Sequence, residues 1–145
     1  EGNPQPPASL TAEPERFSDQ AWDLLLSSQD VARRWRHGDL DVEHLLQVLF
    51  VDPRYQAEVD GLSLPCDRLL DQLESFLAEQ PTARGQDLFI GEDLERLLES
   101  ADRVRGLWGS RLIDLSHFGV NFCLYNCHFS ITGLGNKYIQ WTKSK

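Results

Sequence analysis

The chain has 145 residues, of which 41% are hydrophobic and 26% are charged, values close to those of soluble globular domains. This composition excludes wholesale disorder and a fibrous repeat, and no apolar run approaches the roughly 18 residues of a membrane-spanning helix. The 23 Asp and Glu residues against 14 Lys and Arg residues give a net charge of −9, which disfavours nucleic acid as a partner because its phosphates are also negative.

A flexible leader is expected over residues 1–15. This stretch contains four of the seven prolines and few apolar side chains. Proline has no backbone N–H and interrupts helices, so the stretch cannot form a continuous helix.

A long amphipathic helix is expected after the leader. Its apolar or small residues step by 4, 3, 4, 3 and 4 positions, which places them on one face of a helix of about five turns. Ser18 occupies the N-cap position, and Asp19 lies in the first turn, where its charge suits the positive end of the helix dipole. The face consists of Phe17, Ala21, Leu24, Ser28, Val31 and Trp35.

Three more helical segments are expected to complete a four-helix unit. Asp41 is a good N-cap after the turn at residues 36–38, and the helix that it begins should end before Asp52 and Pro53. A short segment follows near Tyr55–Asp60, and a helix opened by Pro65 ends before residue 81. Residues 82–89 form a polar linker, and no segment before the tail shows convincing strand alternation. The second helix carries Val42, Leu45, Leu46, Leu49 and Phe50, and the fourth carries Leu69, Leu70, Leu73, Phe76 and Leu77.

The first part of this unit is repeated. Residues 17–44 align with residues 90–117 without a gap at a spacing of 73, and seven of the 28 pairs are identical. About two identities would be expected from average composition. Gly91 takes the place of Ser18, and Asp114 takes the place of Asp41. The second apolar face consists of Ile90, Leu94, Leu97, Ala101, Val104 and Trp108.

The residues that carry this pattern resemble the Clp N-terminal (Clp repeat) domain, most closely that of ClpB-type disaggregase chaperones. The resemblance covers residues 16–118. The residues that carry it are Phe17-Ser18-Asp19-Gln20-Ala21, Leu40-Asp41-Val42-Glu43-His44-Leu45-Leu46, Phe89-Ile90-Gly91 and Ile113-Asp114-Leu115-Ser116-His117.

The resemblance implies an all-α fold of two pseudo-twofold-related copies of a four-helix motif. It implies a non-catalytic domain that binds unfolded or aggregated polypeptide, or an adaptor protein, for the AAA+ ring of a parent chaperone. It also implies a peptide groove near the starts of the repeats, which here would use Phe17, Ser18, Phe89 and Ile90. Trp35 and Trp108 are expected in the core, with a groove-lining role as the alternative.

The chain departs from the family after His117. All 23 acidic residues and all 11 arginines lie at or before residue 114, whereas the three lysines lie after it. The second repeat is therefore expected to be incomplete, and residues 119–145 are expected to be a divergent tail of out-of-frame or foreign origin. A stand-alone Clp-repeat regulator and a nonfunctional truncated remnant are the alternatives to a chaperone domain.

The residues capable of chemistry form no specific signature. His44 and His117 lie near helix starts and are expected to be hydrogen-bonded locally, with Asp41 and Asp114 as caps. Cys123, Cys127 and His128 lack the second ligand pair of a zinc site, and no catalytic residue or metal site is expected.

Neither a cofactor nor ATP hydrolysis is expected of this chain. Its glycines form no phosphate cradle of the type G-x-x-x-x-G-K-[ST]. The three cysteines are an odd number with no signal-like segment before them, so a reducing cytoplasm is the expected compartment, and neither nucleic acid nor membrane is expected as a partner.

Deleting residues 121–145 should shift the unfolding midpoint only slightly and increase solubility. A core evolves jointly, so an unrelated segment should not supply matching side chains. Urea unfolding followed by circular dichroism measures the midpoint, and loss of cooperative unfolding after the deletion would show that the tail replaces the missing helices.

Overall fold

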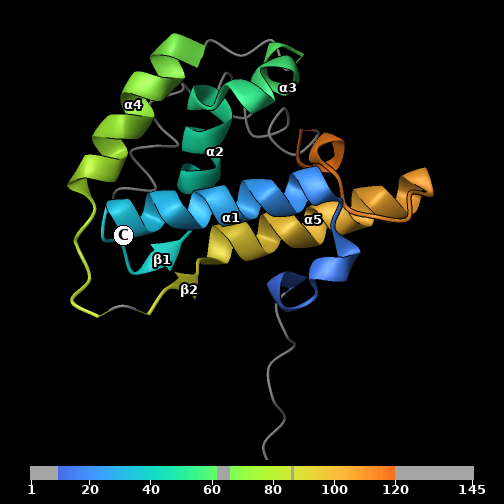
Figure 1. Cartoon of the computed structure of the whole chain (residues 1–145), viewed down its shortest axis with the longest axis horizontal. Coiled ribbons are helices and arrows are strands. Elements are labelled where there is room, and N and C mark those ends of the chain that lie inside the picture. The colour runs from blue at the N-terminus through green and yellow to red at the C-terminus, as the bar shows by residue number, and fades with distance from the viewer. Residues whose placement is uncertain (1–9, 62–65, 86, 120–145) are drawn as a thin grey trace, which may run out of the picture.

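The computed structural model describes residues 10–61, 66–85 and 87–119, and helices dominate this part of the chain (Figure 1). None of the described helices is both long and apolar enough to cross a membrane. Residues 115–119 are also helical. The labelled helices are α1 (Asp19–Arg34), α2 (Val42–Val51), α3 (Gln56–Asp60), α4 (Cys66–Glu79) and α5 (Glu92–Trp108), and the strands are β1 (Asp39–Leu40) and β2 (Phe89–Ile90).

The expected all-α architecture and the expected helix starts are confirmed. The Ser18 hydroxyl accepts a hydrogen bond from the Ala21 N–H and caps α1, and Asp41 caps α2. In the first unit α2 packs against α1, and α4 packs against α2. The helices α1 and α5 run in opposite directions across one core, to which both repeats contribute (Figure 1).

Two short strand pairings join the repeats. In the first, β1 lies parallel to β2, with Leu40 opposite Ile90. In the second, Phe17 forms an isolated parallel bridge with Ile113. Phe17 and Ile90 are equivalent in the repeat, as are Leu40 and Ile113, so each pairing is the counterpart of the other. Neither pairing is visible in the sequence, because a two-residue strand is too short to show alternation.

The carboxylate of Asp41 caps two helices at once. It accepts hydrogen bonds of 2.8 Å from the N–H of Val42, in its own helix, and from the N–H of Leu94, in the first turn of α5. The side chain is only 1% exposed. A Cβ at Gly91 would overlap this carboxylate, so the missing side chain at the start of α5 makes room for a cap from the other repeat.

Asp114 of the second repeat contacts the start of α1 in the same way, but through the Ser18 hydroxyl. Asp114 accepts a hydrogen bond of 2.8 Å from the Leu115 N–H and one of 2.7 Å from the Ser18 hydroxyl. Ser18 in turn caps α1 through the Ala21 N–H. Each repeat therefore supplies an aspartate to the helix start of the other.

The ordered fold begins before residue 16. Leu10–Ala12 and Pro14–Arg16 form 3-10 turns, and Leu10 packs against the core. The Arg16 guanidinium donates a 2.9 Å hydrogen bond to Asp102 of α5. Part of the expected leader, residues 10–15, therefore belongs to the folded domain, because Leu10 and Arg16 have partners that are distant in sequence. The remaining leader and the expected tail from residue 120 onward lie outside the described residues.

Replacing Asp41 with Ala should lower the free energy of unfolding by about 2–3 kcal/mol, because it removes two caps and leaves a buried N–H unsatisfied. Asp39→Ala is the matched control, since Asp39 is an exposed acid two residues away. Urea unfolding followed by circular dichroism measures both variants. Equal effects of the two substitutions would contradict the double-cap role.

Candidate functional site

Three of the four residues of the predicted peptide groove lie in the two strand pairings, and the fourth, Ser18, is the N-cap of α1. Phe17 is only 4% exposed, and its ring lies 5.5 Å from that of Trp22. Ser18 is half-buried between its own helix and Asp114, and Ile90 packs against the core. Only Phe89 is largely exposed, at 64%. The groove role of all four stays a prediction, and Phe89 is the member best placed to meet a partner.

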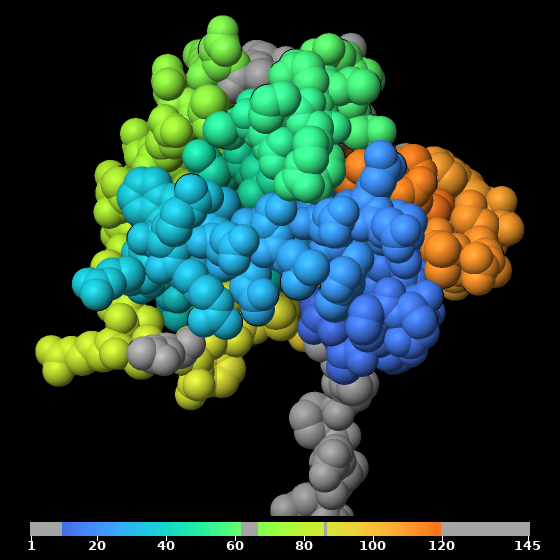
Figure 2. Space-filling model, viewed as in Figure 1, coloured from blue at the N-terminus to red at the C-terminus, as the bar shows by residue number. Residues whose placement is uncertain are grey.

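The end of α5 carries a second exposed apolar surface. Leu107 is 85% exposed and Trp108 is 54% exposed, so the expectation that Trp108 packs in the core is wrong. Figure 2 shows this end of α5 projecting from the body of the molecule. The equivalent Trp35 is half-buried and stacks on His37, with ring centroids 5.9 Å apart.

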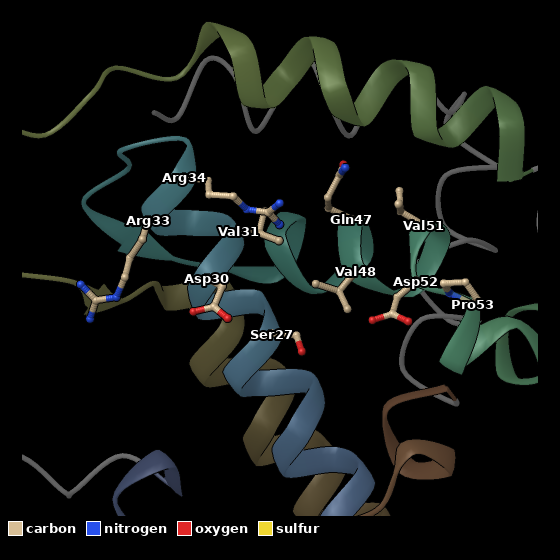
Figure 3. Close-up of a pocket in the computed structure, with 10 residues that line it drawn as sticks. All are labelled: Ser27, Asp30, Val31, Arg33, Arg34, Gln47, Val48, Val51, Asp52 and Pro53. Carbon is tan, nitrogen blue, oxygen red and sulfur yellow. The ribbon is translucent and has the colours of Figure 1, made fainter.

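A groove between α1 and α2 was not anticipated from the sequence. It encloses about 950 Å³, with Val31 contributed by α1 and Val48 and Val51 contributed by α2 (Figure 3). The Gln47 side-chain oxygen, which is buried at this groove, has no hydrogen-bond partner within the described residues. The available signal was Val51, an apolar residue outside the predicted apolar face of α2. Polar and charged side chains also line the groove, namely Ser27, Asp30, Arg33, Arg34 and Asp52.

The buried histidines of the first repeat form a chain of hydrogen bonds. His44 Nδ1 accepts a bond of 2.9 Å from the Asp41 N–H, so its proton must lie on Nε2. This Nε2 lies 2.9 Å from Nδ1 of His37, whose Nε2 lies 3.0 Å from the Leu77 carbonyl oxygen. One consistent assignment follows, in which both rings are neutral and each Nε2–H donates. The expected structural role of His44 is confirmed.

His117 repeats this arrangement in the second copy. Its Nδ1 accepts a bond of 2.8 Å from the Asp114 N–H, which confirms the expected local hydrogen bond. Burial lowers the pKa of His117 below 6.5, and Arg105 acts in the same direction, while the Asp114 carboxylate opposes them. The ring therefore stays neutral near neutral pH and serves the fold.

No group of three or more His, Cys, Asp or Glu side chains that could hold a metal ion occurs in the described part of the chain. Cys123, Cys127 and His128, weighed above as zinc ligands, lie outside it.

The family model of the Clp repeat (R) N-terminal domain matches residues 16–119. Chaperone protein ClpB 2 of Parasynechococcus marenigrum (strain WH8102) is 63% identical over 114 residues, which are 79% of this chain and 13% of that protein. Chaperone protein ClpB 1 of Synechocystis sp. (strain ATCC 27184 / PCC 6803 / Kazusa) is 36% identical over 118 residues, with 76% of this chain and 13% of that protein covered.

The fold is also similar to a solved structure. The Hsp104 N-terminal domain from Candida albicans superposes with a TM-score of 0.62 at 12% identity, over 89% of this chain and 93% of that chain. At this identity the likeness concerns the fold alone. The chain spans only about 13% of the length of the ClpB relatives.

Acid should destabilise the fold partly through His117. Because its pKa is lowered in the folded state, the unfolded chain takes up a proton below about pH 6.5 that the folded chain does not, and the free energy of unfolding falls. His117→Asn retains an acceptor for the Asp114 N–H and cannot titrate. Urea unfolding between about pH 7.5 and pH 5.5 should show a shallower loss of stability in the variant than in the wild type. Parallel losses in the two proteins would contradict the assignment.

Proposed function

The chain belongs to the Clp repeat (R) N-terminal domain family, and on that premise we propose that it is the non-catalytic N-terminal domain of a ClpB-like chaperone. In this role it captures unfolded or aggregated polypeptide, or an adaptor, in the cytoplasm. ATP hydrolysis and disaggregation belong, in this proposal, to the AAA+ ring of the parent chaperone. The relative that is 63% identical to this chain is named chaperone protein ClpB 2, which supports this assignment.

The observation that carries the proposal is the exposure of Phe89. Its side chain is 64% exposed, yet its backbone is fixed, because β2 pairs with β1 and the Phe89 N–H donates a 2.9 Å bond to the Gly38 carbonyl. A large aromatic side chain on a fixed backbone is a suitable anchor for an apolar segment, since little conformational freedom is lost on binding. Unfolded chains expose such segments and folded chains bury them.

The affinity expected from this surface is low. Burying one exposed aromatic side chain contributes about 1.5–3 kcal/mol, which corresponds to about one or two powers of ten in affinity. Weak binding suits a capture domain, because a bound chain must leave it again for the ring. The net negative charge of the chain adds little for an uncharged segment, so the apolar contact should decide the affinity.

A fluorescein-labelled, uncharged peptide rich in Leu, Val and Phe tests the proposal by fluorescence anisotropy. Phe89→Ala should raise the Kd about tenfold, since the variant loses the aromatic contact. Leu26→Ala is the matched control, because Leu26 is also an exposed apolar residue, on α1, and lies away from the strand pairing. It should leave the Kd unchanged.

Two results would contradict the proposal. The first is the absence of measurable binding to the wild-type chain. The second is an equal effect of Phe89→Ala and Leu26→Ala, which would assign the binding to unspecific apolar contact.

A further inference from the structure

Three arginines of this acidic chain line one pocket. The pocket encloses about 580 Å³ between the end of α1 with the turn that follows it and the segment that joins α4 to β2. Arg33 and Arg36 come from the first side and Arg84 comes from the second. Asp87 is its only acidic lining residue among the described part of the chain. Against a net charge of −9 this is a local concentration of positive charge.

Two of these arginines have no counterion among the residues that the structure describes. Neither Arg36 nor Arg84 forms an ion pair with any described residue, and both side chains are exposed. Arg16, Arg54, Arg96 and Arg105, in contrast, all pair with acids within the fold. Arg36 and Arg84 are therefore available to an external anion.

Arg36 stands where the backbone favours glycine. Its φ is +62°, in the left-handed region, and the equivalent residue of the second repeat is Gly109, with φ +72°. The turns are the same, since the His37 N–H bonds the Ala32 carbonyl and the Ser110 N–H bonds the Arg105 carbonyl, both at 3.0 Å. A side chain is unfavourable at such a φ, so the turn itself does not explain the arginine. A strained residue of this kind points to a use for its side chain.

The two sides of the pocket are held together by backbone hydrogen bonds. The Ala83 N–H donates a 2.7 Å bond to the Arg36 carbonyl, next to Arg84 in the chain. The Phe89 N–H, beyond the pocket, bonds the Gly38 carbonyl. Figure 2 shows the turn after α1 and the joining segment together at the left edge of the molecule. The guanidinium groups are thus carried by a preorganised backbone.

We propose that this arginine pocket binds a short acidic segment of a polypeptide partner. Guanidinium groups donate paired hydrogen bonds to carboxylates, and such charge-assisted bonds are stronger than neutral ones. The segment is short because Asp39 and Glu43 line the neighbouring cavity, where an acidic chain would be repelled. This binding is separate from the apolar contact at Phe89, since one recognises charge and the other recognises apolar surface.

A fluorescein-labelled peptide of alternating Glu and Gly tests the pocket by anisotropy with the full chain. The wild type should bind, and added NaCl should weaken the binding, because the attraction is screened. Arg36→Gly and Arg84→Gln should each weaken it about tenfold, the effect of losing one charge-assisted bond. Arg36→Gly copies the second repeat, so its thermal midpoint should not fall below that of the wild type.

Arg103→Gln is the matched control. Arg103 is exposed on α5 outside the pocket, and its replacement changes the net charge by the same amount. This variant should bind the acidic peptide within about twofold of the wild type, as expected for a distant surface charge. The uncharged apolar peptide should bind Arg36→Gly as it binds the wild type, which separates the failure of this proposal from failure of the apolar capture proposal.

Three results would overturn the inference. One is an acidic peptide that does not bind the wild type, and another is equal weakening by Arg36→Gly, Arg84→Gln and Arg103→Gln. The third is an oligothymidylate of the same charge that binds more tightly than the peptide with the same dependence on Arg36, since the pocket would then recognise nucleic acid.

Discussion

The reciprocal capping by Asp41 and Asp114 is the interaction on which the rest of the domain depends. The first N–H groups of a helix have no partner within the helix, and here the other repeat helps to satisfy them. The start of α5 uses the carboxylate of Asp41, and the start of α1 uses Ser18, which is itself bonded to Asp114. A single repeat would leave the Leu94 N–H or the Ser18 hydroxyl without its partner. The domain is therefore a unit of two repeats by hydrogen bonding as well as by its shared core.

The two repeats share the same helix starts, strand pairings and turn, whereas the side chains at some equivalent positions differ and have different roles. Gly91 has no side chain, which leaves room for the Asp41 carboxylate at the start of α5. The equivalent Ser18 instead bonds Asp114 through its hydroxyl. At the equivalent turns that follow α1 and α5, Arg36 lines a pocket, whereas Gly109 has no side chain. Symmetry thus builds the scaffold, and the departures from symmetry create the surfaces that can distinguish partners.

Local patterns predicted the helices and the caps, because periodicity and residue type are properties of a few neighbouring residues. The pairing of Phe17 with Ile113 could not be foreseen, since its strands are too short to leave a pattern and its partner is distant in the sequence. Trp108 shows the other limit. Its position at the end of the apolar face of α5 was predicted, but periodicity does not show whether another element covers that part of the face. The arginine pocket was missed because Arg36 and Arg84 meet only through the fold.

Under the proposed binding of an acidic segment, the carboxylates near the arginine pocket would set its selectivity. At ordinary ionic strength an exposed charge is felt over only about 10 Å, so a bound segment responds to the side chains immediately around it and little to the net charge. An acidic segment is then attracted within the pocket and repelled by the surrounding carboxylates, including Asp39 and Glu43 in the neighbouring cavity. Discrimination improves when attraction at one place is combined with repulsion around it. An uncharged apolar segment experiences neither effect, so under the two proposals the same acidic domain would offer Phe89 to unfolded chains and the arginines to a different kind of sequence.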